Sequence, residues 1–140
     1  MRAFKVALFL AAGALSPLVA HHSQSAIFDM SKKVAVTGVL KKVDWLNPHI
    51  RLYMETKDAS GKVDSFVWES NPPAWFRRVN VNRATFTKVV GQTVTAEGVK
   101  ARDGSNYGYM SKFTFPDKTS FEVVPDRDVT ASAKDVPAKD

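Results

Sequence analysis

Cysteine is absent from this chain of 140 residues. Its absence excludes disulfide bonds, thiolate metal sites, haem attachment through cysteine and thiol chemistry. A small domain without disulfides must be stabilised by a core of large apolar side chains. We therefore expect many of its aromatic residues to be buried.

The sequence shows no obvious concentration of charge of one sign. It has 20 basic and 14 acidic residues, and the two kinds are interspersed. Nucleic-acid-binding proteins usually gather Lys and Arg on one face or along one stripe. Since no such cluster is visible, we expect no nucleic-acid partner.

Recognisable enzyme motifs are also missing. Asp103-Gly104-Ser105 is a turn that lacks the lysine and the spacing of a phosphate-binding loop. Ser23 follows His22, but no third group of a catalytic triad is identifiable. The acidic residues are scattered rather than paired for acid and base catalysis. We therefore predict a protein that is not an enzyme.

A long hydrophobic run is missing too, because the apolar stretch 6–15 is shorter than the roughly 20 residues of a membrane span. Arg2 and Lys5 precede this stretch, Ser16 and Pro17 interrupt it, and small residues follow up to Ala20. This order is typical of a cleavable secretory signal. The sequence predicts a signal peptide over 1–20, cleavage after Val19 or Ala20, a periplasmic location and no transmembrane segment after cleavage.

The remaining sequence has the alternating pattern of β-strands. Strands are expected over 34–45, with a bend at Gly38, and over 50–55, 63–69, 92–100 and 107–115. Residues 21–30 are expected to form an extended arm, and 121–124 to close the ordered part. Prolines at 72–73 and a capping residue at Asn82 predict a short helical connection that ends at Gly91.

This order of elements predicts a mainly β domain over 21–124. Three strands, one short helical connection and two further strands are the order of a small OB-like five-stranded barrel. A small open β-sandwich would give the same pattern, because periodicity does not report closure. Residues 125–140 lack periodicity and are expected to be a disordered tail.

Four short motifs carry a resemblance to a known family. They are His21-His22-Ser23, Trp45-Leu46-Asn47-Pro48-His49, Trp68-Glu69 and Ala101-Arg102-Asp103-Gly104-Ser105. Together they resemble the secreted proteins of domain-of-unknown-function family 6152, over most of residues 21–124. The resemblance implies a secreted single domain and no established activity.

The chain has three histidines, and their placement suggests a metal site. After cleavage at Ala20, the free amine and the ring of His21 can chelate one ion, with His22 nearby and His49 as a further nitrogen ligand. Such nitrogen donors suit Cu(II) and resemble the histidine brace of periplasmic copper carriers. Cleavage after Val19 would instead place His22 third from the amine, a square-planar arrangement for Cu(II) or Ni(II).

The sequence also allows an interpretation without metal. His21 and His22 would then be solvated residues of the arm, and His49 would hydrogen-bond a neighbouring backbone group. Glu69, Met54 and Met110 are candidates for additional ligands. We take a non-enzymatic copper-binding or copper-handling module as the first functional hypothesis.

Aromatic residues support a second hypothesis. Trp45, Trp68, Trp75, Tyr107 and Tyr109 could form a sheet face on which a small ligand or an envelope partner protein stacks. The alternative is that they build the core, which a small domain without disulfides needs.

We predict that mass spectrometry of protein from the soluble envelope fraction of a Gram-negative host will show a chain that begins at His21 or Ala20. The observed cut decides which terminal chelate is available. An intact Met1 terminus in the cytosol would contradict the export prediction.

Overall fold

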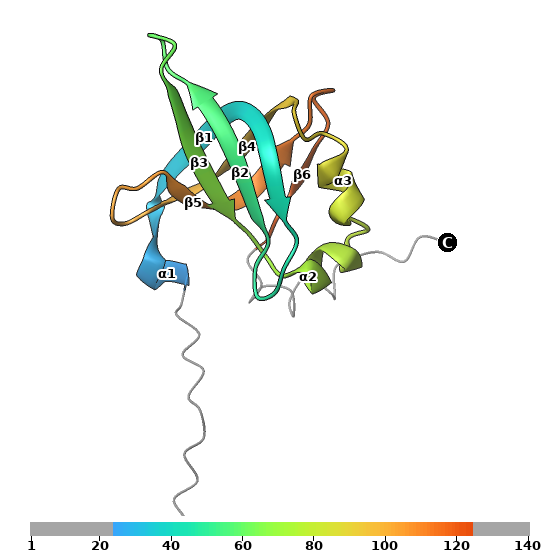
Figure 1. The fold of residues 1–140 in the computed structure, drawn as a ribbon. Coiled ribbons are helices and arrows are strands. Elements are labelled where there is room, and N and C mark those ends of the chain that lie inside the picture. The colour runs from blue at the N-terminus through green and yellow to red at the C-terminus, as the bar shows by residue number, and fades with distance from the viewer. Residues whose placement is uncertain (1–23, 125–140) are drawn as a thin grey trace, which may run out of the picture.

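Residues 24–124 are described by a computed structural model, which is mainly β (Figure 1). The predicted signal peptide, His21, His22 and the predicted tail lie outside the described residues. The strands are β1 (Phe28–Asp44), β2 (Arg51–Lys57), β3 (Val63–Glu69), β4 (Thr93–Ala101), β5 (Tyr107–Thr114) and β6 (Ser120–Glu122). The helices are α1 (Gln24–Ile27), α2 (Pro73–Arg78) and α3 (Arg83–Thr87).

The long strand β1 joins two parts of the sheet. Residues 33–39 pair with β4, and residues 39–44 pair with β2. At the change of partner, a Cβ on Gly38 would lie 2.4 Å from the carbonyl oxygen of Glu55, so only glycine permits this approach. Glycine is therefore required at residue 38 for this close approach, while the register shift falls between Leu40 and Lys42, two residues beyond the predicted bend.

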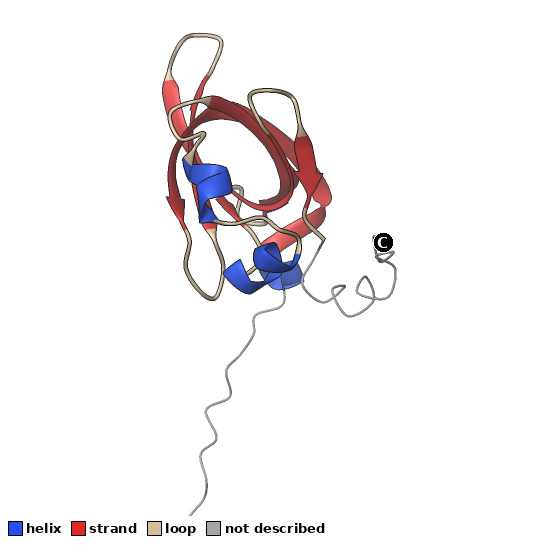
Figure 2. Ribbon diagram, turned by 90° about the vertical axis from the view of Figure 1, so that its right-hand side faces the viewer, coloured by secondary structure: helices blue, strands red, loops and turns tan. Residues whose placement is uncertain are grey.

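The strands form one sheet in the order β3-β2-β1-β4-β5-β6. All neighbours in this order are antiparallel, and a parallel pairing of β3 with β5 closes a ring of hydrogen bonds. The curled strands are visible in Figure 2. β6 pairs with β5 outside this ring, so the sheet has six strands rather than the five expected.

The helical connection between β3 and β4 has the predicted start and end signals. Pro73 occupies the first turn of α2. Asn82 caps α3 by accepting a hydrogen bond from the backbone of Thr85, in a capping box. Gly91 has a positive φ of 85° after the connection. Within residues 24–124, no helix has both the length and the apolar character needed to cross a membrane.

The expectation of an extended arm over 21–30 is wrong for residues 24–27, whereas residues 28–30 are extended. Residues 24–27 form the helical turn α1, and β1 begins at Phe28. Arg102 holds this turn, since its backbone N–H donates to the Ile27 carbonyl at 2.9 Å and its Nε donates to the Ser25 carbonyl at 2.9 Å. These partners are far away in sequence, so local pattern did not reveal them.

The core is built around Trp68, which is fully buried. A Cβ on Gly98 or Gly108 would lie 2.9 Å or 2.6 Å from its indole ring, so both glycines make room for it. The predicted burial of Phe66 and Trp68 is confirmed. Phenylalanine rings from the helices and the last strands complete the core; they are Phe76, Phe86, Phe113 and Phe121.

The alternation of buried and exposed side chains along residues 107–115 is not continuous, contrary to the expectation. We expected Ser111 to share a face with Tyr109 and Phe113, but Ser111 is exposed while the other two are buried. The pairing of β4 with β5 shifts here, because Glu97 faces Lys112 whereas Gly98 faces Met110. This bulge changes the phase of the alternation.

We predict that Trp68→Ala will lower the free energy of unfolding by about 3 to 5 kcal/mol, because it leaves a cavity in the core. Urea unfolding followed by circular dichroism measures this loss. The control Val63→Ala, at an exposed position of β3, should change stability by less than about 0.5 kcal/mol. Equal small effects of the two substitutions would contradict the central place of Trp68.

Candidate functional site

His49 lies on the loop between β1 and β2. β1 ends at Asp44, the Asn47-Pro48 peptide bond in the loop that follows is cis, and His49 comes directly after it. This loop lies at the same end of the molecule as α1 and α2 (Figure 1). The sequence motif around Pro48 therefore brings its histidine to that end.

The His49 ring has a fixed orientation. Its Nδ1 lies 2.8 Å from the backbone carbonyl oxygen of Ser70. A carbonyl only accepts hydrogen bonds, so Nδ1 carries the hydrogen and Nε2 of the neutral ring keeps its lone pair. The side chain is 31% exposed. The expected hydrogen bond from His49 to a backbone group is present, and the same bond prepares Nε2 to accept a ligand.

Glu69 lies beside this ring on the side of Nδ1. Its Oε1 is 3.8 Å from Nδ1 of His49, and its Oε2 is 3.7 Å from Nη2 of Arg51. The Tyr107 hydroxyl also donates to Oε2. Burial raises the pKa of Tyr107, with a further contribution from Glu69, so the phenol remains a donor. Glu69 thus interacts with Arg51 and Tyr107 as well as His49, and its side chain is only 12% exposed.

Ser70 and Asn71 connect the loop to the rest of the domain. The Asn71 carbonyl accepts from the Ile50 backbone N–H at 3.3 Å, and its side chain donates to the Val124 carbonyl at 2.6 Å. Its Oδ1 accepts from the hydroxyl of Tyr109. Sequence reasoning missed this supporting role, because Asn71 before two prolines was interpreted only as the start of a helix.

A small hollow opens beside His49. Its volume is about 160 Å³, and its lining residues are Asp44, Leu46, Asn47, Pro48, His49 and Arg51. Asp44 accepts hydrogen bonds from Lys42 at 3.0 Å and from the Tyr53 hydroxyl at 2.9 Å. The bond from Lys42 lowers the pKa of the Asp44 carboxyl, which therefore stays ionised. The hollow combines a carboxylate, an imidazole and a guanidinium group.

The described chain begins close to this end. The Phe28 ring packs against Tyr107 and Tyr109, with centroid distances of 5.3 Å and 5.5 Å. The Tyr109 ring in turn lies 6.4 Å from that of His49, edge to face. Only one ring therefore separates Phe28 from His49.

The predicted aromatic sheet face is largely an interior feature. Trp68, Trp75 and Tyr109 are buried. Trp45 is partly buried and packs on Phe76, with ring centroids 5.5 Å apart. Trp68 and Trp75 belong to the main core cluster, and Tyr109 packs with Phe28 in a smaller one.

The sulfur candidates are buried as well. Met54 and Met110 are part of the core cluster and are buried, so their sulfur atoms are not accessible from solvent. Within residues 24–124, no three side chains of His, Cys, Asp or Glu gather in a way that could hold a metal ion.

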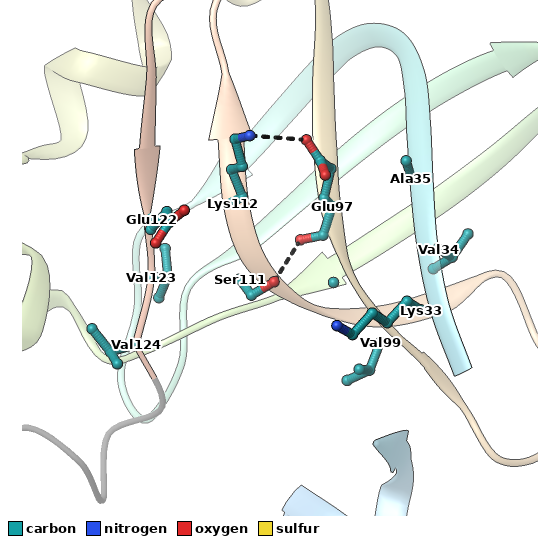
Figure 3. Close-up of a pocket in the computed structure, with 11 residues that line it drawn as sticks. Lys33, Val34, Ala35, Glu97, Val99, Ser111, Lys112, Glu122, Val123 and Val124 are labelled. Carbon is teal, nitrogen blue, oxygen red and sulfur yellow. Dashed lines mark hydrogen bonds and ion pairs between the residues drawn. The ribbon is translucent and has the colours of Figure 1, made fainter. Parts of the chain in front are cut away.

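A second hollow lies on the face formed by β1, β4, β5 and β6 (Figure 3). Its volume is about 500 Å³. Lys112 lies 3.6 Å from Glu97, and the Ser111 hydroxyl donates to the Glu97 carbonyl at 3.3 Å. None of the predicted site residues lines it, and two of its four charged side chains, Lys112 and Glu97, already form an ion pair.

Comparison with known proteins supplies a family. The model of a family of unknown function (DUF6152) matches residues 9–111. The chain belongs to this family. No curated protein and no solved structure matches it. The part matched by the family model includes the His49 loop, Glu69 and Tyr107, and the resemblance drawn from the four motifs is confirmed.

We predict that neutral His49 will carry its hydrogen on Nδ1, because the Ser70 carbonyl can only accept. Long-range ¹H–¹⁵N correlation spectra of the imidazole at pH 8 distinguish the two tautomers. A predominant Nε2–H form would contradict this geometry. His49→Gln provides the assignment control, since it removes the imidazole signals of this residue alone.

Proposed function

We propose that the protein is an exported, periplasmic Cu(II)-binding or copper-handling module. The ligands would be the amine and ring of His21, the ring of His22 and Nε2 of His49. The orientation of His49 is the observation that carries this proposal. The described domain acts as the rigid holder of that one ring.

Histidines that bind metals usually donate their second ring nitrogen to a carboxylate or a backbone carbonyl. His49 has such an arrangement, since Nδ1 donates to Ser70 at 2.8 Å. Glu69 lies on the same side of the ring and interacts with Arg51 and Tyr107. We therefore assign Glu69 a positioning role rather than the role of a direct ligand.

The length of the chain between Gln24 and His21 supports the participation of the amino terminus. Three extended residues cover up to about 10 Å. The Phe28 ring is separated from that of His49 by Tyr109 alone, with centroid distances of 5.5 Å and 6.4 Å. The described chain begins with α1, which lies at the same end of the molecule as the His49 loop (Figure 1), so a terminus at His21 is at most about 10 Å of extended chain from that end.

The available donor atoms favour Cu(II) over Cu(I). Cu(I) prefers soft sulfur ligands, whereas Cu(II) prefers nitrogen and oxygen in a tetragonal arrangement. Cysteine is absent from the chain, and of the three methionines within residues 24–124, Met54 and Met110 are buried while Met30 is exposed. The proposed site therefore relies on imidazole and amine nitrogens, with the thioether of Met30 as the one exposed sulfur within the described residues.

An interaction module is the second candidate function. We propose that the ring order β1-β2-β3-β5-β4, with helices between β3 and β4, corresponds to an OB-type barrel. OB folds bind ligands through the β2 and β3 face and the adjoining loops. The hollow beside His49 occupies the equivalent region, where Arg51 and Tyr53 of β2 offer polar groups to an envelope protein or a small ligand.

We predict that processed protein with His21 at its terminus will bind one Cu(II) tightly. One additional residue before His21 should weaken binding strongly, because the amine no longer closes its chelate ring. His49→Ala should weaken binding less. Affinity should fall as the pH drops through about 6.5, because protonated imidazole does not ligate.

Copper titration with electron paramagnetic resonance on these three proteins tests the proposal. Glu69→Gln tests the positioning role, because it changes a group beside the ring without removing a nitrogen ligand, and it should weaken binding less than His49→Ala. Equal binding by the processed and extended forms would show that the terminal amine is not a ligand. Unchanged binding by His49→Ala would show that the domain contributes no ligand to the site. An unchanged thermal melt would show that this variant is folded.

A further inference from the structure

The segment between Glu69 and Glu97 contains no acidic residue. Its basic residues are Arg77, Arg78, Arg83 and Lys88. This segment includes both α2 and α3, which lie on the same side of the molecule (Figures 1 and 2). The basic residues of this segment therefore lie on or beside two helices on one side of the molecule.

Three of these side chains lack a carboxylate partner. Arg77, Arg78 and Arg83 are exposed, and none of the ion pairs within residues 24–124 includes them. Lys88 differs from them, since it lines a hollow together with Asp117. We call Arg77, Arg78 and Arg83 the arginine patch.

Stabilisation of the helices explains only part of this patch. Arg77 and Arg78 lie in the last turn of α2, where cations interact favourably with the helix dipole. Arg83 is the first residue of α3, where a cation is unfavourable for the same reason. Its position and the absence of acidic neighbours in the segment point to an external anion.

An apolar side chain is exposed within the patch. Val79 follows Arg78 directly and is 47% exposed. Asn80 has a positive φ of 59° and turns the chain between the two helices. Exposed apolar residues beside Lys and Arg are typical of surfaces that lie at a membrane interface.

We propose that the arginine patch binds an anionic phospholipid surface, with Val79 at the acyl boundary. Guanidinium groups bind phosphate oxygens through paired hydrogen bonds. Anionic lipid headgroups attract basic residues that lie within a Debye length of the surface, about 8 to 10 Å. This proposal does not depend on the copper site.

The test compares binding of the full chain, as processed by its host, to two kinds of vesicle. One kind is phosphatidylcholine alone, and the other contains about a third phosphatidylglycerol. We expect binding to the anionic vesicles only. Each basic residue near such a surface contributes about fivefold, so Arg77→Gln/Arg78→Gln should lower the partition coefficient on the order of 25-fold.

The matched control is Lys32→Gln/Lys33→Gln. Both lysines are exposed on the early part of β1, which begins on the opposite side of the view in Figure 1 from α2 and α3. This variant has the same net charge as the arginine variant and should keep most of the binding. Thermal melts of both variants establish that they are folded.

Three outcomes would overturn the proposal. Equal losses in the two variants would show an effect of net charge rather than of this patch. Equal binding to both kinds of vesicle would show that anionic headgroups are not recognised. Unchanged binding by the arginine variant would assign the contact to another surface.

Discussion

The parallel pairing of β3 with β5 is the contact on which the other features depend. It aligns Val67 with Tyr107 and Glu69 with Tyr109. Without it, the sheet would be open between these strands and Glu69 would lose the Tyr107 hydroxyl. The residues that follow β3, Ser70 and Asn71, would also lose their fixed distance from β5. The pairing that closes the ring therefore also positions the residues that contact His49.

Successive side chains of β3 point to opposite faces of the closed ring and have different roles. Trp68 points inward and fills the space left by Gly98 and Gly108, whereas Glu69 points outward to Arg51 and Tyr107. A side chain at either glycine would move the indole or separate the strands. The two core glycines therefore help to maintain the geometry of the polar contacts that Glu69 makes on the outer face.

Local chemistry made much of the fold predictable from the sequence. The third strand over 63–69 and the cap at Asn82 were predicted correctly, because alternation and capping are read from neighbouring residues. The bulge at Ser111 and the partners of His49 were not, since they depend on contacts between distant segments. Glu69 and Tyr107, for example, are 38 positions apart. Charge counted over the whole chain likewise concealed the acid-free segment that carries the arginine patch.

Asn71 links the two surfaces for which we propose functions. Its carbonyl accepts from Ile50, next to His49, and its side chain interacts with Tyr109 and Val124. α2 starts two residues later, and its buried Trp75 and Phe76 fix the helix whose last turn presents Arg77 and Arg78. The His49 loop and α2 are therefore joined by one set of hydrogen bonds and buried rings. If α2 meets a lipid surface, that surface lies at the end of the molecule that also carries the His49 loop (Figure 1).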